Sequence, residues 1–240
     1  MFSNTRKILK TLKQTNKFVF YSESQHYQKY FYNFIFLLNS KNKKITYVSS
    51  DKNDTINLDN VTNIFIGEGF FRSLFFLLIK TKNFFLTVTD LNNNVLKKNS
   101  YVENYIYIFH AAVSAHKAYT KSAFENYDTI MCIGDYHVQE ILELEKNYNL
   151  PKKKLLKSGY FYFDYLNNKA NLNEDKSNIL IAPSWNYSEN NFLNYKCEDL
   201  IKYLINKNFH VKFRPHPEHF KRSTKILLDI KKKILKFFSI

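Results

Sequence analysis

The segment Phe209-His-Val-Lys-Phe-Arg-Pro-His-Pro217 joins an expected buried strand to two prolines. Its first five residues alternate apolar and polar side chains, which is typical of a strand. Each proline fixes its own φ and pushes the preceding residue into an extended conformation. Arg214 and His216 should therefore lie two residues apart with their side chains on the same side. Because ligands bind at the C-terminal ends of strands in open α/β sheets, this pair predicts a phosphate-bearing ligand.

Short β-rich runs recur along the whole chain at intervals that leave room for helices. Strands that alternate with helices indicate parallel βαβ units, so we expect an α/β fold with a parallel, Rossmann-like sheet. The expected strands are 17–21, 44–48, 63–66, 84–89, 105–109, 129–133, 178–182 and 209–213, and the expected helices include 25–38, 70–80, 136–148 and 196–206.

The polar stretch Asn167–Ser177 lacks hydrophobic periodicity and is the expected linker. Six expected strands precede it and two follow. The sequence therefore predicts a basic amphipathic segment at 1–16, a Rossmann-like domain at 17–166, a linker at 167–177 and an incomplete second Rossmann-like domain at 178–240. With two strands, the second sheet is expected to have an unpaired edge and an uncovered apolar face.

The formal net charge of +15 is concentrated at the two ends of the chain. Residues 1–17 carry five Lys or Arg and no acid, and residues 221–240 carry seven against one acid. Both ends interleave these charges with Ile, Leu and Phe, which is typical of an amphipathic helix on an anionic membrane surface. The alternative is that this pattern has no function and only reflects the composition of the whole chain, which is rich in Lys, Asn, Ile, Phe and Tyr throughout. A nucleic-acid binder more often spreads its basic residues over a folded face, so we expect no nucleic-acid partner.

The sequence also argues against several classes of protein. Its apolar runs are far shorter than the roughly 20 residues that span a bilayer, and its N-terminus does not have the pattern of a signal peptide. Cys132 and Cys197 lie far apart without metal-ligand spacing. We therefore expect a cytoplasmic protein with free thiols and no metal site.

A histidine follows the expected strand 105–109 directly, within Phe109-His-Ala-Ala-Val-Ser-Ala-His116. Small residues here would let a ligand approach the backbone, and Ser114 could donate a hydrogen bond to a phosphate or hydroxyl. An imidazole titrates near neutrality, so His110 is a candidate general base and His116 a candidate substrate-binding residue. A structural role for each histidine is the alternative.

Two further strand ends carry candidate binding residues. Gly67 and Gly69 follow the expected strand 63–66, where glycine permits either a tight turn or a close approach of substrate. Ser184 follows the expected strand 178–182, at the level of Arg214 in the other strand. It could cap the next helix or contact a donor phosphate.

Nine segments, taken in order from about residue 17 to about residue 230, resemble the CDP-glycerol glycerophosphotransferases and their relatives in teichoic acid and capsule synthesis. They are Phe20-Tyr-Ser-Glu-Ser-Gln-His-Tyr27, Ile66-Gly-Glu-Gly69, Thr87-Val-Thr-Asp-Leu91, Tyr105–Tyr119, Ala123-Phe-Glu-Asn-Tyr-Asp128, Cys132-Ile-Gly134 with His137, Gly159-Tyr160 through Asp164, Ile179-Leu-Ile-Ala-Pro-Ser-Trp185 and Arg214-Pro-His-Pro217.

This resemblance implies a GT-B architecture of two Rossmann-like domains. It implies transfer of glycerol phosphate from CDP-glycerol to a hydroxyl of a membrane-borne polymer, with release of CMP and without a cofactor. His110 would deprotonate the acceptor, whereas His216 and Arg214 would bind the donor phosphates. It also implies a peripheral protein at the inner face of the plasma membrane.

The chain departs from the family in two places. Ala111 follows His110, where the family usually has Gly or Ser, and no Ser-Asp…Asp-Ser motif follows His219. The resemblance is therefore to a C-terminally truncated member, which either acts with a partner chain that supplies the missing part or is active in a reduced form. The isolated chain is expected to bind CDP-glycerol weakly or not at all. Two alternatives stay open: a non-catalytic fragment of such a transferase, and a GT-B glycosyltransferase that uses another CMP- or CDP-linked donor.

Overall fold

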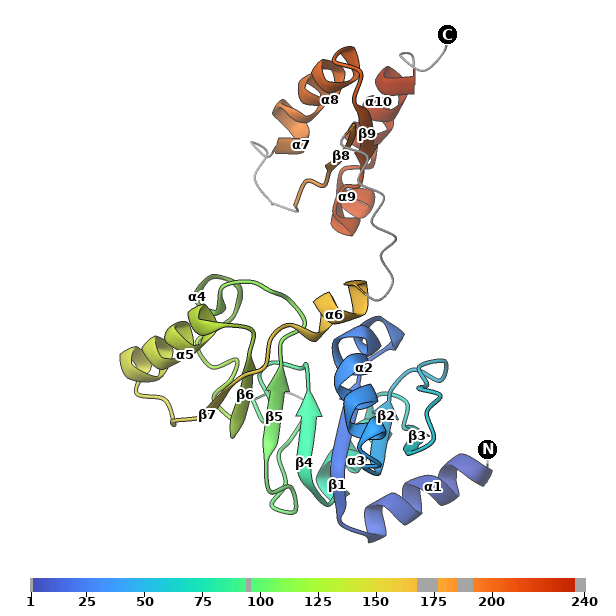
Figure 1. The fold of residues 1–240 in the computed structure, drawn as a ribbon, viewed down its shortest axis with the longest axis vertical. Coiled ribbons are helices and arrows are strands. Elements are labelled where there is room, and N and C mark those ends of the chain that lie inside the picture. Colours follow the sequence, from blue (N-terminus) through green and yellow to red (C-terminus); the bar gives the residue numbers. More distant parts are fainter. Residues whose placement is uncertain (1, 94–95, 168–176, 185–191, 236–240) are drawn as a thin grey trace. The chain divides into compact units, whose positions relative to one another are not determined.

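The computed structural model describes residues 2–93, 96–167, 177–184 and 192–235 (Figure 1). The chain forms two compact units, Met1–Ala170 and Asn171–Ile240. The division falls within the expected linker 167–177, of which residues 168–176 lie outside the described residues. Each unit has its own sheet and its own hydrophobic core.

In the described part of the first unit, seven parallel strands form one sheet in the order β3-β2-β1-β4-β5-β6-β7 (Figure 1). The expected α/β class with a parallel, Rossmann-like sheet is confirmed. The chain reverses its direction of progress across the sheet between β1 and β4, and ligands bind at such switch points. The strands are β1 (Asn16–Ser22), β2 (Ile45–Ser49), β3 (Val61–Phe65), β4 (Thr81–Leu86), β5 (Tyr105–Ile108), β6 (Thr129–Cys132) and β7 (Lys154–Lys157).

The edge strand β7 was not expected, so the expectation of six strands before the linker is wrong. Its sequence Lys-Leu-Leu-Lys is only four residues long and largely exposed. It lacks the alternation or the apolar run that marks a strand. Lysines at a sheet edge also discourage pairing with another chain, which fits its position beside β6.

Helices cover both faces of this sheet because side chains of each strand alternate between them. Val19 and Tyr21 of β1 belong to one core cluster, and Phe20 belongs to the other. The first cluster includes side chains from α1 (Phe2–Lys13), α3 (Phe70–Leu78), α4 (Ala115–Ala118) and α5 (Asp135–Tyr148). The second includes side chains from α2 (Gln25–Ser40) and α6 (Phe161–Asn167).

The basic segment at the N-terminus forms α1, which is docked on the first unit. The side-chain amide of Asn4 donates to the carbonyl oxygen of Phe65 at 2.7 Å and accepts from its N–H at 3.1 Å. Ile8 and Leu12 pack against the core. Ile8 and Leu12 are therefore partly buried within the unit, while Leu9 and the basic side chains are exposed.

The second unit contains, among its described residues, a parallel pair of strands, β8 (Asn178–Ile181) and β9 (His210–Phe213). Helices α8 (Cys197–Asn206) and α10 (Thr224–Leu235) cover the apolar face of this pair, so the expectation of an uncovered apolar face is wrong. The opposite face is exposed but mostly polar, and Leu180 is its one apolar member within the two strands. The basic C-terminal run thus contributes Ile226, Leu227 and Ile230 to the core. The remaining helices are α7 (Phe192–Tyr195) and α9 (Pro217–Arg222).

Candidate functional site

His110 lies at the C-terminal end of β5, as expected from the sequence. Its half-buried ring sits among three tyrosine rings, with centroid distances of 5.8 Å to Tyr27, 6.1 Å to Tyr30 and 6.4 Å to Tyr119. The hydroxyl of Tyr160 donates to the carbonyl oxygen of His110 at 3.0 Å. These contacts fix both the ring and the backbone of His110 from α2, from the segment after α4 and from the segment after β7.

The surroundings of His110 favour its neutral form. Burial lowers the pKa of His110, and the charge of His26 acts in the same direction, whereas the backbone of Thr87 opposes the shift. Among the described residues, neither Nδ1 of His110 nor the buried Oγ1 of Thr87 has a hydrogen-bond partner. A neutral imidazole at this place can accept a proton.

The loop that follows His110 is held by α5. The fully buried His137 accepts from the N–H of Ile133 through Nδ1 at 3.4 Å and donates through Nε2 to the carbonyl oxygen of Val113 at 2.7 Å. The carboxylate of Glu140 accepts from the N–H of Ala115 at 2.5 Å. His137 therefore joins the ends of two neighbouring strands and positions the loop between His110 and α4.

His116 makes a structural contact in this conformation, whereas the side chain of Ser114 does not cap α4. The ring Nε2 of His116 lies 2.8 Å from the carbonyl oxygen of Glu140 in α5. Ser114 precedes α4 without a side-chain cap hydrogen bond. Within the described residues, no ring contact or hydrogen bond joins His116 to His110. Their role in substrate binding stays a prediction.

Gly67 and Gly69 form the turn into α3, with φ angles of 69° and 60° that favour glycine. Next to this turn lie three charged residues, Glu23, Glu68 and Arg72, whose proximity was not predicted from the sequence. Burial raises the pKa of Glu23, which follows β1, and Glu68 acts in the same direction, whereas the charge of Arg72 opposes the shift. Nε of Arg72 is buried without a hydrogen-bond partner among the described residues. The Gly-Glu-Gly motif was their one signal in the sequence.

In the second unit, Arg214 and His216 are exposed. The N–H of Arg214 donates to the carbonyl oxygen of Ile181 at 2.9 Å, and that of His216 to Pro183 at 3.1 Å. These bonds continue the pairing of β8 and β9 and bring the segment of Ser184 beside that of Arg214. The structure thus places the three expected phosphate-binding residues at one end of the strand pair.

Sequence reasoning also missed His219, which supports this end of the second unit. Its ring is fully buried in α9, and Nε2 donates to the carbonyl oxygen of Ser184 at 3.2 Å. Nδ1 lies 3.5 Å from the hydroxyl of Ser223. The local sequence around His219 does not predict this supporting role, because the burial of its ring depends on the distant segment that contains Ser184.

The described residues also bear on two other kinds of site. They contain no group of three or more His, Cys, Asp or Glu side chains that could hold a metal ion. None of the helices they form is both long enough and apolar enough to cross a membrane. Cys132 and Cys197 are buried free thiols.

No protein-family model matches the sequence, and no curated protein matches it. Solved structures of the wall teichoic acid polymerase TagF are similar in fold, with TM-scores of 0.53 for a histidine variant and 0.51 for another TagF structure. The identities are 13% and 14%, and the alignments cover 90% of this chain. A further variant soaked with CDPG gives a TM-score of 0.51 at 11% identity. The chain spans about 65% of the length of the TagF chain. The likeness confirms, at the level of fold, the resemblance noted in the sequence.

Proposed function

We propose that this chain transfers glycerol phosphate, or a related polyol phosphate, from a CDP-linked donor to a hydroxyl of a cell-envelope polymer or lipid-linked acceptor. The observation that carries the proposal is His110. It combines a neutral-favouring environment, an unpartnered Nδ1 and a position at the C-terminal end of β5. The likeness in fold to TagF supports the reaction class, and TagF is named as a wall teichoic acid polymerase.

In the proposed reaction, the acceptor oxygen attacks the phosphorus that carries the glycerol. A new P–O bond forms to the acceptor, the P–O bond to CMP breaks, and CMP leaves with the electron pair. His110 takes the proton of the acceptor hydroxyl. Arg214 and His216, with Ser184 beside them, bind the donor phosphates and offset the charge that develops on the leaving group.

The two units would form a GT-B arrangement, with the first unit on the acceptor side and the second on the donor side. The reaction needs no cofactor in this proposal. The acceptor is membrane-borne, so the protein works at the inner face of the plasma membrane. A partner chain would supply further contacts to the donor.

The test is release of CMP from CDP-glycerol in the presence of a glycerol-phosphate acceptor. Replacing His110 by Ala should lower the rate roughly 100-fold or more, because a positioned general base contributes about that much. Arg214→Ala should weaken donor binding with little change in melting temperature, since Arg214 is exposed.

The same assay with CDP-ribitol and CMP-sugars identifies the donor. Release of CMP from one of these donors but not from CDP-glycerol would change the identity of the donor and leave the proposed reaction class unchanged. No release from any of them, with a folded wild-type protein, would refute the transferase and leave the non-catalytic alternative. A His110→Ala variant with wild-type activity would exclude His110 as the base.

A further inference from the structure

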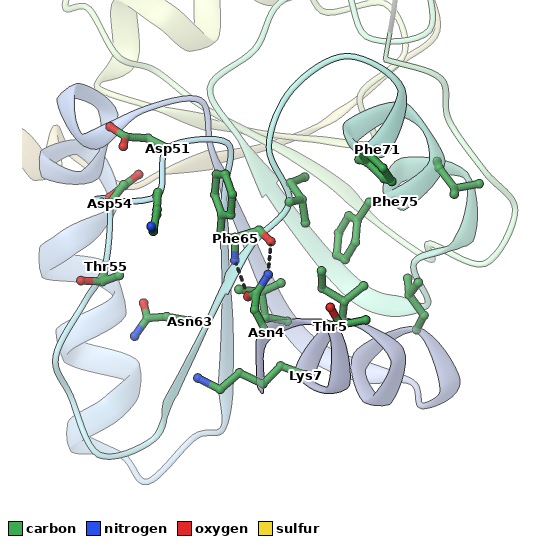
Figure 2. Close-up of a pocket in the computed structure, with 16 residues that line it drawn as sticks. Asn4, Thr5, Lys7, Asp51, Asp54, Thr55, Asn63, Phe65, Phe71 and Phe75 are labelled. Carbon is green, nitrogen blue, oxygen red and sulfur yellow. Dashed lines mark hydrogen bonds between the residues drawn. The ribbon is translucent and has the colours of Figure 1, made fainter. Parts of the chain in front are cut away.

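Helix α3 presents two different sides, one to an apolar pocket and one to the sheet. The pocket has a volume of about 690 Å³ and lies between α1, β3 and α3, where Phe71 and Phe75 are seen (Figure 2). The described residues that line it do not include Arg72. Arg72 shares a helix face with Phe76, whose ring packs edge-to-face on Tyr21 of β1 at a centroid distance of 5.0 Å. Arg72 therefore lies on the side of α3 that faces β1.

The guanidinium of Arg72 lies beside a buried pair of hydroxyl groups near the carboxyl ends of β1 and β2. The hydroxyls of Tyr21 and Ser50 are 2.9 Å apart. Burial raises the pKa of Tyr21, and Arg72 is close enough to oppose this rise. In the described part of the chain, Nε of Arg72 is buried without a hydrogen-bond partner, and Arg72 takes part in no ion pair. A buried polar group without a partner is uncommon and points to one that the chain itself does not supply.

The carboxylate of Glu23 lies near the same guanidinium and also lacks a direct partner. Burial raises the pKa of Glu23 and the charge of Arg72 opposes this rise, so the two charges are neighbours. Among the residues that the structure describes, no hydrogen bond or ion pair reaches the carboxylate. The turn before α3 adds open space, because a Cβ added at Gly69 would meet no atom within 4 Å. Two opposite charges that lie near each other without touching leave room for a group between them.

The group that fits between a guanidinium and a carboxylate is a hydroxyl. A hydroxyl can accept a hydrogen bond from an N–H of Arg72 and donate its own hydrogen to Glu23. An ionised phosphate mainly accepts hydrogen bonds, and Glu23 and the exposed Glu68 nearby would repel its charge. With two carboxylates against one guanidinium, this place favours a neutral polyol or sugar over an anion.

Glu23 and Arg72 lie at the same edge of the sheet as His110. The pairing of β1 with β4 and of β4 with β5 brings Glu23 level with Phe109, the residue before His110. Strands β1 and β5 flank β4, so they are about 10 Å apart, roughly the span of one sugar or polyol unit with a hydrogen bond at either end. Tyr27 connects the two places. Burial and the charge of Glu23 both raise the pKa of Tyr27, and its ring lies 5.8 Å from that of His110.

We propose that Glu23 and Arg72 form an acceptor subsite, which binds a hydroxyl of the terminal polyol or sugar unit other than the hydroxyl that reacts at His110. The acceptor unit then has at least two hydroxyls. An acceptor without the second hydroxyl is rejected, because it leaves the charged groups of the subsite without partners. This rests on the proposed function for the role of His110.

The test compares two acceptors that differ by this one hydroxyl. Glycerol 1-phosphate has a second hydroxyl beside the primary one, whereas 3-hydroxypropyl phosphate has the primary one alone. With CDP-glycerol as donor, the kcat/KM of the wild type should be lower for 3-hydroxypropyl phosphate roughly tenfold to a hundredfold, since hydrogen bonds to charged groups are lost. Arg72→Met and Glu23→Leu should each raise the KM for glycerol 1-phosphate by a similar factor. Both should leave the KM for CDP-glycerol unchanged and discriminate little between the acceptors.

The matched controls are Lys82→Met and Glu103→Leu, which remove exposed charges near the start of β4 and before β5, at the opposite end of the sheet. Both should keep the preference of the wild type. Equal kcat/KM values of the wild type for the two acceptors would overturn the subsite, and this comparison does not depend on whether a variant folds. A folded Arg72→Met variant that discriminates as the wild type does would overturn it as well.

Binding without a donor separates this inference from the transferase. Ligand-detected nuclear magnetic resonance of the full chain should show binding of glycerol 1-phosphate that Arg72→Met weakens, and weaker binding of 3-hydroxypropyl phosphate. That difference without release of CMP would keep the subsite and refute the transferase, whereas release of CMP without any difference between the two probes would do the reverse. Inorganic phosphate that binds as well as glycerol 1-phosphate, and that Arg72→Met releases, would assign the place to an anion and overturn the hydroxyl subsite.

Discussion

At the scale of single residues, His137 makes the stability of the fold depend on pH. Burial lowers its pKa, while its hydrogen bond to Val113 and the charge of Glu140 oppose the shift. The unfolded chain therefore takes up a proton at a higher pH than the folded chain does. The stability that His137 contributes is complete above its ordinary pKa of about 6.5, and it is lost as the pH falls from there through the folded pKa.

The variant His137→Gln should be less stable than the wild type by about 1–3 kcal/mol at neutral pH, because buried partners lose hydrogen bonds. This difference should shrink towards acid pH, since Gln does not titrate. Urea unfolding of both proteins across this range measures it. His210→Gln is the control, because His210 is exposed. A difference that stays constant with pH would show that the titration of His137 does not affect stability.

At the scale of elements, docking of α1 depends on Asn4, which both donates to and accepts from the backbone of Phe65. Asn4→Ala removes both hydrogen bonds and should lower the free energy of unfolding by about 1–2 kcal/mol. The rate of amide hydrogen exchange in α1 should increase in this variant, because the helix opens more often. Lys10→Ala, an exposed change in the same helix, should leave both unchanged. Unaltered exchange in the Asn4 variant would show that Ile8 and Leu12 hold the helix without it.

The elements also show how far sequence reasoning reaches. Strands such as β1 and β5 were predictable because aromatic and β-branched residues are concentrated in them, and the position of His110 followed from the end of β5. The short, lysine-flanked strand β7 was not predictable, because it lacks the alternation of apolar and polar residues. The rings around His110 come from segments up to 83 residues before it and 50 after it, as Tyr27 and Tyr160 show. Local patterns do not encode such contacts.

At the scale of the whole molecule, each core cluster draws its residues from one unit. We therefore expect a core defect to loosen the unit that contains it. Ile201 is 1% exposed in the second unit, and Ile35 is fully buried in the first. Replacing either by Ala should cost about 2–5 kcal/mol of local stability through lost burial and a residual cavity.

Hydrogen exchange with peptide resolution distinguishes the two variants. Ile201→Ala should speed exchange in β8, β9, α8 and α10, and Ile35→Ala should speed it in α2 and the strands beneath it. Since the second unit has the smaller core, its amides should also exchange faster in the wild type. Acceleration of both units by either single variant would show that they unfold together. The strand ends at Arg214 and at His110 would then share one stability.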